Sequence, residues 1–143
     1  MTWFVDTNLL VYARDSSEPS KHGRARDWLS FLWTTQVGRL SVQVLQEYYV
    51  TVTAKLNPGL SQKEARDDVA LFLAWRPLGI DSALLEAGWR EQDDFGFSWW
   101  DSLIVAAARQ QGCKALLTED LQHDQDLGGL LVVDPFRREP EEL

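Results

Sequence analysis

The segment Trp3-Phe4-Val5-Asp6-Thr7-Asn8 decides the fold, because an apolar run ends there abruptly at an acidic residue. Bulky and β-branched residues in such a run predict a short buried strand over 3–5. Apolar residues continue over 9–13 without a polar break, which predicts a helix that packs back on the sheet. Ligands of open α/β sheets bind at the carboxyl ends of strands, where Asp6 would lie. Alternatively, Asp6 and Asn8 only cap the helix by accepting hydrogen bonds from its first amides.

Length and composition indicate one folded domain over residues 1–143, with a frayed charged tail at 137–143. The chain is 45% hydrophobic and 11% aromatic, which is enough for a sizeable core. Cys113 is the only cysteine, which excludes an intrachain disulfide and a cluster of thiolate ligands. The N-terminus lacks a basic segment followed by an apolar one, and the longest apolar run, 103–108, is too short to cross a bilayer. We therefore expect a cytoplasmic protein without a membrane partner.

The net charge of −8 argues against indiscriminate binding to polyanions. The charge is uneven, because residues 1–66 carry eight Lys and Arg against six Asp and Glu, whereas residues 67–143 carry six against sixteen. The densest basic segment, 14–26, can be a nucleic-acid patch, but a solvated helix face is the simpler interpretation.

Hydrophobic periodicity predicts helices that alternate with short strands. Further helices are expected over 22–35, through 44–52, from the capping box at 61–64, from Asp81 or Ser82, and over 99–111. Further strands are expected at 39–42, 77–80, 114–117 and 130–133, with loops at 15–20 and 93–97. This alternation predicts the α/β class, with a mainly parallel sheet that carries helices on both faces. Trp28, Trp33 and Trp89 fall on the apolar stripes and are expected in the core.

Four acidic residues can converge at one edge of such a sheet. Asp6 and Asp120 each follow an apolar strand, Asp101 lies in the first turn of a helix capped by Ser98, and Glu47 lies in a helix that can cross the same edge. Two unit charges about 5 Å apart repel by about 3 kcal/mol at an effective dielectric near 20. Convergence therefore requires protonation or a cation, and oxygen ligands favour Mg²⁺ or Mn²⁺. Such a site suits phosphoryl chemistry, although Asp101 can equally serve only to stabilise its helix.

The sequence gives less support to other kinds of catalytic site. His22, His123 and Cys113 have no triad spacing, and the chain has no phosphate-binding glycine loop. His123 lies close enough to Asp120 in sequence to touch substrate, but a surface position is the simpler interpretation. Adjacent tryptophans at 99–100 point about 100° apart on a helix. One of them can stack on a base or line a dimer contact, but burial is the favoured expectation.

Four segments together resemble those of a PIN domain of the VapC toxin type, and the resemblance spans residues 2 to about 136. They are Phe4-Val5-Asp6-Thr7-Asn8-Leu9-Leu10-Val11-Tyr12, Gln46-Glu47, Ser98-Trp99-Trp100-Asp101 with the apolar run to Ala108, and Leu117-Thr118-Glu119-Asp120-Leu121-Gln122. The resemblance implies a twisted parallel sheet and an Mg²⁺- or Mn²⁺-dependent endoribonuclease. It further implies that Asp6, Glu47, Asp101 and Asp120 form the catalytic metal site.

The resemblance also implies supporting residues and partners. Thr7, Asn8 and Ser98 would orient the carboxylates or a water on the metal, and Thr118 would support them from behind. Glu119, Asp124 or Asp126 would compete with Asp120 for the place of the fourth acidic ligand. The implied partners are RNA, a VapB-type antitoxin and a second copy of the chain in a homodimer.

Three other functions remain open from the sequence. The first is a PIN nuclease of RNA maturation or decay that is not a toxin. The second is a catalytically inactive PIN module that binds RNA or protein, against which the full set of four acids argues. The third is a metal-dependent phosphatase that acts on small phosphate esters.

Overall fold

A short parallel sheet forms the centre of the chain, whose computed structural model describes residues 1–140. Its strands are β1 (Trp3–Val5), β2 (Gly38–Arg39), β3 (Ala115–Leu117) and β4 (Leu131–Val133). They lie in the order β2-β1-β3-β4, and each neighbouring pair is parallel. The predicted α/β class is confirmed, and the sheet is parallel throughout rather than only mainly so.

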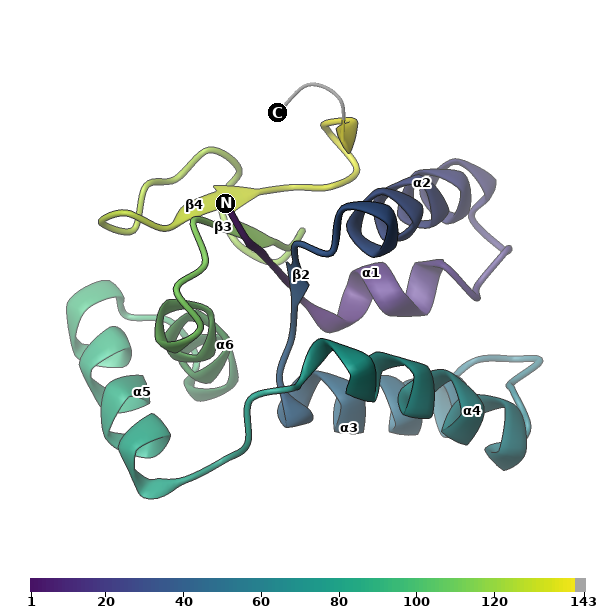
Figure 1. Cartoon of the computed structure of the whole chain (residues 1–143), viewed down its shortest axis with the longest axis horizontal. Coiled ribbons are helices and arrows are strands. Elements are labelled where there is room, and N and C mark those ends of the chain that lie inside the picture. Colours follow the sequence, from purple (N-terminus) through teal and green to yellow (C-terminus); the bar gives the residue numbers. More distant parts are fainter. Residues whose placement is uncertain (141–143) are drawn as a thin grey trace.

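Helices cover both faces of this sheet. They are α1 (Thr7–Tyr12), α2 (Pro19–Thr35), α3 (Val42–Val50), α4 (Gln62–Phe72), α5 (Ser82–Phe95) and α6 (Trp99–Gln110). A π-helical turn, η1 (Thr51–Lys55), extends α3, and a 3₁₀ turn, η2 (Leu73–Trp75), follows α4. Figure 1 shows α5 and α6 on one side of the strands and α1 to α4 on the other. Within residues 1–140, none of the helices has the length and apolar character needed to span a bilayer.

The two central strands are buried along their whole length. Every residue of β1 and β3 is inaccessible or nearly so, and the core continues into α1 and α6. A parallel strand that is covered on both faces needs apolar residues at successive positions rather than at alternate ones. This requirement explains why an unbroken run such as Trp3-Phe4-Val5 forms the central strand.

Helix starts follow the predicted capping residues. Ser61 Oγ accepts a hydrogen bond from Glu64 N at 3.1 Å, and Ser61 N donates to Glu64 Oε1 at 3.2 Å, which completes the capping box of α4. Asp81 caps α5 through Leu84 N. Each cap satisfies amides that have no partner within the helix.

Several predicted boundaries were wrong. The helix expected from residue 22 begins at Pro19, because proline suits the first helical turn. The strand expected at 39–42 is only Gly38–Arg39, since Ser41 already caps α3. The strand expected at 77–80 is reduced to one bridge between Ser41 and Leu78.

The loop expected at 93–97 is also shorter than predicted. Helix α5 continues to Phe95, and Gly96 ends it with φ +71°. Glycine adopts this left-handed conformation without strain. Of the predicted tail, residues 137–140 are described, and Arg138 O accepts a hydrogen bond from Trp28 Nε1. Residues 141–143 lie outside the described part of the chain.

Two of the three tryptophans expected in the core are partly exposed. Trp28 is fully buried, whereas Trp33 is 38% exposed and Trp89 is 55% exposed. Helix α5 packs on α6 at Gly88, where an added Cβ atom would lie 3.0 Å from the Trp99 ring. Trp89 is the next residue, so a rotation of about 100° turns it away from this contact.

Two glycine substitutions test how tightly the chain is packed at β2 compared with the exposed face of α2. A Cβ atom on Gly38 would lie 2.5 Å from the Trp75 ring, whereas one on Gly23 in α2 would meet nothing within 4 Å. We expect Gly38→Ala to lower the free energy of unfolding by about 1–3 kcal/mol through overpacking. We expect Gly23→Ala to raise it by about 0.5–1 kcal/mol, because alanine favours a helix. Urea unfolding measures the free energy of unfolding of both variants. Equal stability of the two variants would contradict the close contact between Gly38 and Trp75.

Candidate active site

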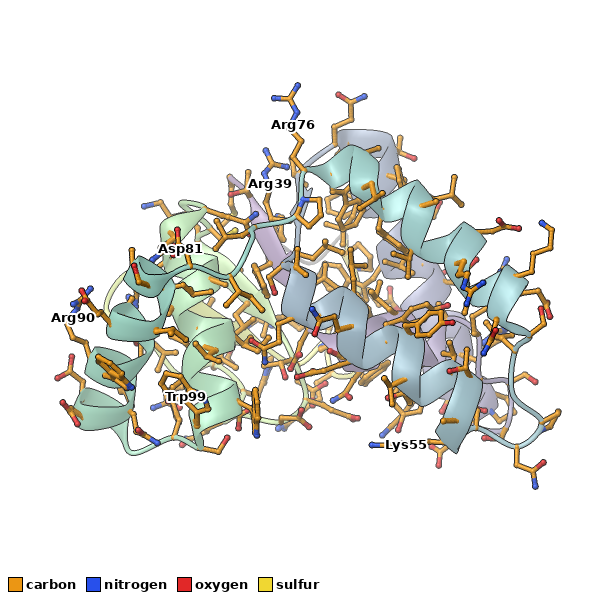
Figure 2. All side chains as sticks on the ribbon, turned by 90° about the horizontal axis from the view of Figure 1, so that it is seen from below. Arg39, Lys55, Arg76, Asp81, Arg90 and Trp99 are labelled. Atoms are coloured by element: carbon orange, nitrogen blue, oxygen red, sulfur yellow. The ribbon has the colours of Figure 1, made fainter. Side chains whose placement is uncertain are left out.

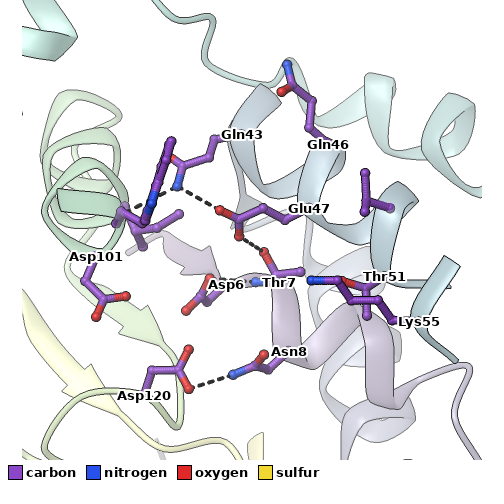
Figure 3. A pocket seen from close by; sticks show the side chains of 13 residues that line it. Asp6, Thr7, Asn8, Gln43, Gln46, Glu47, Thr51, Lys55, Asp101 and Asp120 are labelled. Atoms are coloured by element: carbon purple, nitrogen blue, oxygen red, sulfur yellow. Dashed lines mark hydrogen bonds between the residues drawn. The ribbon is translucent and has the colours of Figure 1, made fainter. Parts of the chain in front are cut away.

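A cavity of about 550 Å³ lies at the carboxyl edge of the sheet. Thirteen residues line it: Asp6, Thr7, Asn8, Gln43, Gln46, Glu47, Val50, Thr51, Lys55, Trp100, Asp101, Ile104 and Asp120. All four acids that the sequence selected as catalytic are among them. Figure 3 shows that their carboxylates reach this space from four separate segments of the chain. We call this space the acidic cavity.

Asp6 is the most enclosed of the four acids, with 5% of its surface exposed. It follows β1 directly and caps α1, since its Oδ1 accepts a hydrogen bond from Thr7 N at 2.7 Å. Its Oδ2 accepts from Thr118 Oγ1 at 2.8 Å. The helix-capping interpretation of Asp6 is therefore correct, and it is compatible with a place in the acidic cavity.

Glu47 enters the acidic cavity from α3. Its Oε2 accepts a hydrogen bond from Thr7 Oγ1 at 2.8 Å, and its Oε1 accepts from Gln43 Nε2 at 3.0 Å. Gln43 precedes Glu47 by one helical turn, so both side chains lie on the same face of α3. Thr7 and Gln43 thus hold Glu47 from opposite sides.

Asp120 reaches the acidic cavity from the loop after β3. Its Oδ1 accepts a hydrogen bond from Asn8 Nδ2 at 3.0 Å. Its backbone N donates to Thr118 Oγ1 at 3.1 Å, and the same hydroxyl donates to Asp6. Thr118 lies buried behind the acidic cavity, where one side chain fixes the positions of two acids.

Asp101 enters from the first turn of α6. Its backbone N donates to Ser98 Oγ at 3.2 Å, which is the predicted cap. Ser98 itself does not line the acidic cavity. Its role in the structure is to begin the helix whose first turn carries Asp101.

Burial and like charge act together on two of these acids. Burial raises the pKa of Asp6 to about 7, and the charges of Asp120 and Glu47 add to the rise, while the hydrogen bonds from Thr118 and Thr7 oppose it. The pKa of Asp101 is also raised, first by burial and then by Asp120 and Glu47, with Ser98 opposing. The charges of Asp120 and Glu47 thus add to the effect of burial and disfavour the charged forms of Asp6 and Asp101.

The alternative acidic ligands lie elsewhere. Glu119 forms an ion pair with Lys21 at 2.9 Å, on the other side of the loop from Asp120. Asp124 pairs with Arg138 at 2.9 Å, and Asp126 accepts from the amides of a glycine turn. His123 Nδ1 accepts from Asp134 N, away from the acidic cavity. None of these side chains is among the residues that line the acidic cavity.

Sequence reasoning did not assign a role to four polar residues of the acidic cavity, namely Gln43, Gln46, Thr51 and Lys55. Gln43 had a signal, because it precedes Glu47 by four residues on a helix. Lys55 had none, since only the π-helical turn η1 brings it to the acidic cavity. Trp100 was expected to be buried, but it is 62% exposed and lines the acidic cavity.

The donor set suits a hard divalent cation. All candidate ligands are oxygen atoms, and the raised pKa values of Asp6 and Asp101 show that positive charge would be favourable there. Within residues 1–140, however, no three His, Cys, Asp or Glu side chains are close enough as placed to hold one ion together. Mg²⁺ commonly binds through one or two carboxylates and keeps several waters. The residues therefore fit a hydrated ion better than a closed cage of ligands.

The fold and the site define an α/β domain with acidic residues at the carboxyl edge of a parallel sheet. The chain belongs to the PIN domain family, whose sequence profile matches residues 3–125. No protein of curated function matches the chain.

Three solved structures illustrate the similarity in fold. VapC20 of Mycobacterium tuberculosis, described as a toxin that cleaves the sarcin-ricin loop, is 21% identical, with a TM-score of 0.62 over 83% of this chain and 90% of that one. A chain of FitAB bound to the IR36 DNA fragment is 20% identical, with a TM-score of 0.71 over 96% and 98%. VapBC2 of Rickettsia felis, bound to a DNA fragment from its promoter, is 16% identical, with a TM-score of 0.60 over 92% and 97%.

The raised pKa of Asp6 predicts a pH dependence of stability in protein stripped of metal. Between about pH 4 and pH 7 the folded state binds more protons than the unfolded state, so the free energy of unfolding falls as the pH rises. A rise in pKa from 3.8 to about 7 corresponds to a loss of about 4 kcal/mol. Asp6→Asn should flatten this dependence and be more stable than the wild type at pH 8, as measured by urea unfolding in chelator.

Asp93→Asn is the matched control, because it removes the same charge from an exposed position on α5. The free energy of unfolding of this variant should fall with rising pH as steeply as that of the wild type. An Asp6→Asn protein whose stability falls as steeply as that of the wild type would show that Asp6 does not cause the effect.

Proposed function

We propose that the chain is a metal-dependent endoribonuclease that hydrolyses RNA phosphodiester bonds. The observation that carries this proposal is the convergence of Asp6, Glu47, Asp101 and Asp120 on one cavity of a PIN domain. We propose these four acids as the catalytic residues and as ligands of Mg²⁺ or Mn²⁺. When bound, the ion would activate a water for attack on the phosphorus and stabilise the leaving oxygen.

The protein's own groups would hold these acids in place. Thr118 would keep Asp6 and Asp120 at a fixed separation, because its hydroxyl bonds to both segments. Thr7 would orient Glu47, and Asn8 would orient Asp120. Such preorganisation matters because the attacking and leaving oxygens must be aligned before the reaction.

Two residues of the acidic cavity suit contact with an RNA chain. Lys55 extends into it from η1, as Figure 3 shows, and supplies a positive charge among the acids. Trp100 exposes its ring at the same cavity. A cation that binds phosphate and a ring that stacks on a base are the usual elements of single-strand binding. Single-stranded or looped RNA is therefore the proposed substrate.

We further propose that the chain is the toxin of a type II toxin-antitoxin pair and acts in the cytoplasm. Support comes from the similar folds of VapC20, which is described as a toxin, and of a toxin-antitoxin complex from Klebsiella pneumoniae. The proposed partners are a VapB-type antitoxin and a second copy of the chain in a homodimer. Growth arrest on expression that a small neighbouring gene relieves would support this role over RNA maturation.

Substitution of Asp101 tests the nuclease proposal. Asp101→Asn should lower RNA cleavage by roughly 100-fold or more, because it removes a charge from the reaction centre. The variant should remain folded, since Asp101 gains no ion pair with any residue described and its charge opposes burial. Cleavage of single-stranded RNA with Mg²⁺, Mn²⁺ or chelator is the measurement, and thermal melting with each metal reports binding. Ligand linkage predicts about 2.7 kcal/mol of stabilisation at a hundredfold excess over Kd.

Glu119→Gln is the control, because Glu119 pairs with Lys21 outside the acidic cavity. It should cleave RNA like the wild type. An active Asp101→Asn protein would refute the proposed site, and a metal-induced shift without cleavage would favour the inactive binding module.

The proposed RNA contacts can be measured in the inactive Asp101→Asn background. Trp100→Ala should weaken single-stranded RNA binding by about 1–3 kcal/mol through loss of stacking. Lys55→Ala should lower affinity for all sequences and reduce the salt slope by about one phosphate contact. Fluorescence anisotropy at several salt concentrations gives both values.

Trp89→Ala and Lys63→Ala are matched controls, because both side chains are exposed and neither lines the acidic cavity. Both should bind RNA like the parent protein. If the controls lose as much affinity as Trp100→Ala and Lys55→Ala, the RNA does not enter the acidic cavity.

A further inference from the structure

A second cavity of about 550 Å³ lies at the opposite edge of the sheet from the acidic cavity. It adjoins Gly38, the first residue of β2, whereas Asp6 follows the last residue of β1. Its principal side chains are Trp33, Gln36, Arg39, Trp75, Arg76 and Gln111. Figure 2 shows Arg39 and Arg76 together on one side of the molecule and Lys55 on the other. We call this space the basic cavity.

Two tryptophans give the basic cavity an aromatic wall. The Trp75 ring lies directly on the backbone of Gly38, where a Cβ atom would approach it to 2.5 Å. The Trp33 ring centroid is 5.1 Å from that of Trp75. Trp33 is 38% exposed, so part of its ring remains accessible. The close fit at Gly38 keeps Trp75 fixed behind the more accessible ring.

The charge of the basic cavity contrasts with that of the chain. Among residues 1–140, no acidic residue lines it, although the whole chain carries a net charge of −8. Arg39 Nη1 donates to Gly38 O at 2.8 Å and to Gln36 O at 3.3 Å, which orients its guanidinium group. Within residues 1–140, neither Arg39 nor Arg76 forms an ion pair. Two arginines beside one cavity thus lack an anionic partner among the described residues.

Two residues at the rim of the basic cavity have a left-handed backbone conformation. Among residues 1–140, three non-glycine residues have positive φ, and two of them, Gln36 at +60° and Arg76 at +53°, line the basic cavity. Each follows the end of a helical segment, where glycine is the usual residue. Strain of this kind is concentrated at ligand-binding sites. Both positions carry long polar side chains where glycine would adopt the same backbone conformation with less strain.

Gln111 adds a further polar group to the same wall. Its Nε2 donates to Leu40 O at 3.1 Å, which fixes the amide. Its Oε1 is buried and has no hydrogen-bond partner in the described part of the chain. The basic cavity therefore combines two guanidinium groups, an aromatic surface and an unfilled hydrogen-bond acceptor.

We propose that the basic cavity binds a nucleoside phosphate, with the phosphate at Arg39 and Arg76 and the base against Trp33. The planar guanidinium group matches phosphate oxygens in pairs, and an aromatic ring stacks on a base whatever its identity. The volume lies within the range of small-molecule sites. The ligand is either a free nucleotide or the 5′-terminal nucleotide of an RNA. This site is separate from the acidic cavity and does not depend on its activity.

Calorimetric titration of the full chain tests this assignment, with AMP, ADP, GMP, adenosine and inorganic phosphate as probes. A nucleotide should bind at least tenfold more tightly than either adenosine or phosphate. Absence of nucleotide binding at millimolar concentration, or equal binding of phosphate alone, would overturn the proposal. Short RNAs with a 5′-phosphate or a 5′-hydroxyl, titrated into the Asp101→Asn protein, distinguish an RNA end from a free nucleotide as the source.

Charge-removing substitutions locate the site. Arg39→Gln and Arg76→Gln should each weaken nucleotide binding by tenfold or more. Arg90→Gln is the matched control, because Arg90 is an exposed arginine on α5 that does not line the basic cavity. Binding that survives both substitutions, or that falls equally in Arg90→Gln, would refute the assignment.

Arg76→Gly separates a binding role from a structural one. Glycine relieves the strain at φ +53°, so the variant should have a higher Tm than the wild type without ligand. It should nevertheless bind nucleotide at least tenfold more weakly, whereas Arg76→Lys should restore part of the affinity. A Tm that rises with no change in affinity would show that Arg76 has no part in binding.

Discussion

The parallel pairing of β1 with β3 is the constraint on which the acidic cavity depends. The register joins Val5 to Leu117, so the residues that follow each strand, Asp6 and Thr118, emerge side by side at the same edge. The hydrogen bond from Thr118 to Asp6 forms there, and the amide of Asp120 bonds to the same hydroxyl. A shift of one residue in this register would turn Asp6 and Thr118 to opposite faces of the sheet. Two strands of only three residues each therefore bring together side chains that lie 112 residues apart in the sequence.

The interactions that position the acids also oppose their charge. A buried carboxylate loses hydration, and nearby carboxylates add repulsion, so the charged form of Asp6 is disfavoured although two hydrogen bonds support it. The neutral neighbours Thr7, Asn8 and Gln43 orient the acids without neutralising them. Arginine or lysine in those positions would stabilise the fold more but would compete with a bound cation. The positions of these acids thus lower the stability of the metal-free fold, and a cation at the proposed site would offset this loss.

Sequence patterns identified the elements that carry the acids better than they identified the surroundings. Asp6 follows an unbroken apolar run and Asp101 follows a serine cap, and both signals are local. Which of Glu119 and Asp120 lines the acidic cavity is not a local property of the sequence. It follows from tertiary contacts, since Lys21 pairs with Glu119 outside the cavity, whereas Asn8 bonds to Asp120, which lines it.

The basic cavity had no sequence signal for a related reason. Turns with positive φ are found in sequences through glycine or asparagine, but here the residues are Gln36 and Arg76. The partial exposure of Trp33 could not be predicted from the sequence either, because its position on the apolar stripe of α2 predicted burial. Its ring instead packs against the rings of Phe72 and Trp75. Such contacts between helices distant in sequence are not encoded in the periodicity of either helix.

The uneven charge of the chain bears on how an anionic substrate could approach the acidic cavity. Nine of its lining residues belong to the nearly balanced segment 1–66, and four belong to the strongly acidic segment 67–143. The acidic cavity is therefore built from two parts of the sequence that differ strongly in net charge. With a net charge of −8, long-range attraction would not supply affinity for the proposed RNA substrate, so short-range contacts and the proposed cation would have to do so. A binding mode of this kind would select RNA that can extend bases and phosphates into the acidic cavity, and it would disfavour nonspecific binding along a duplex.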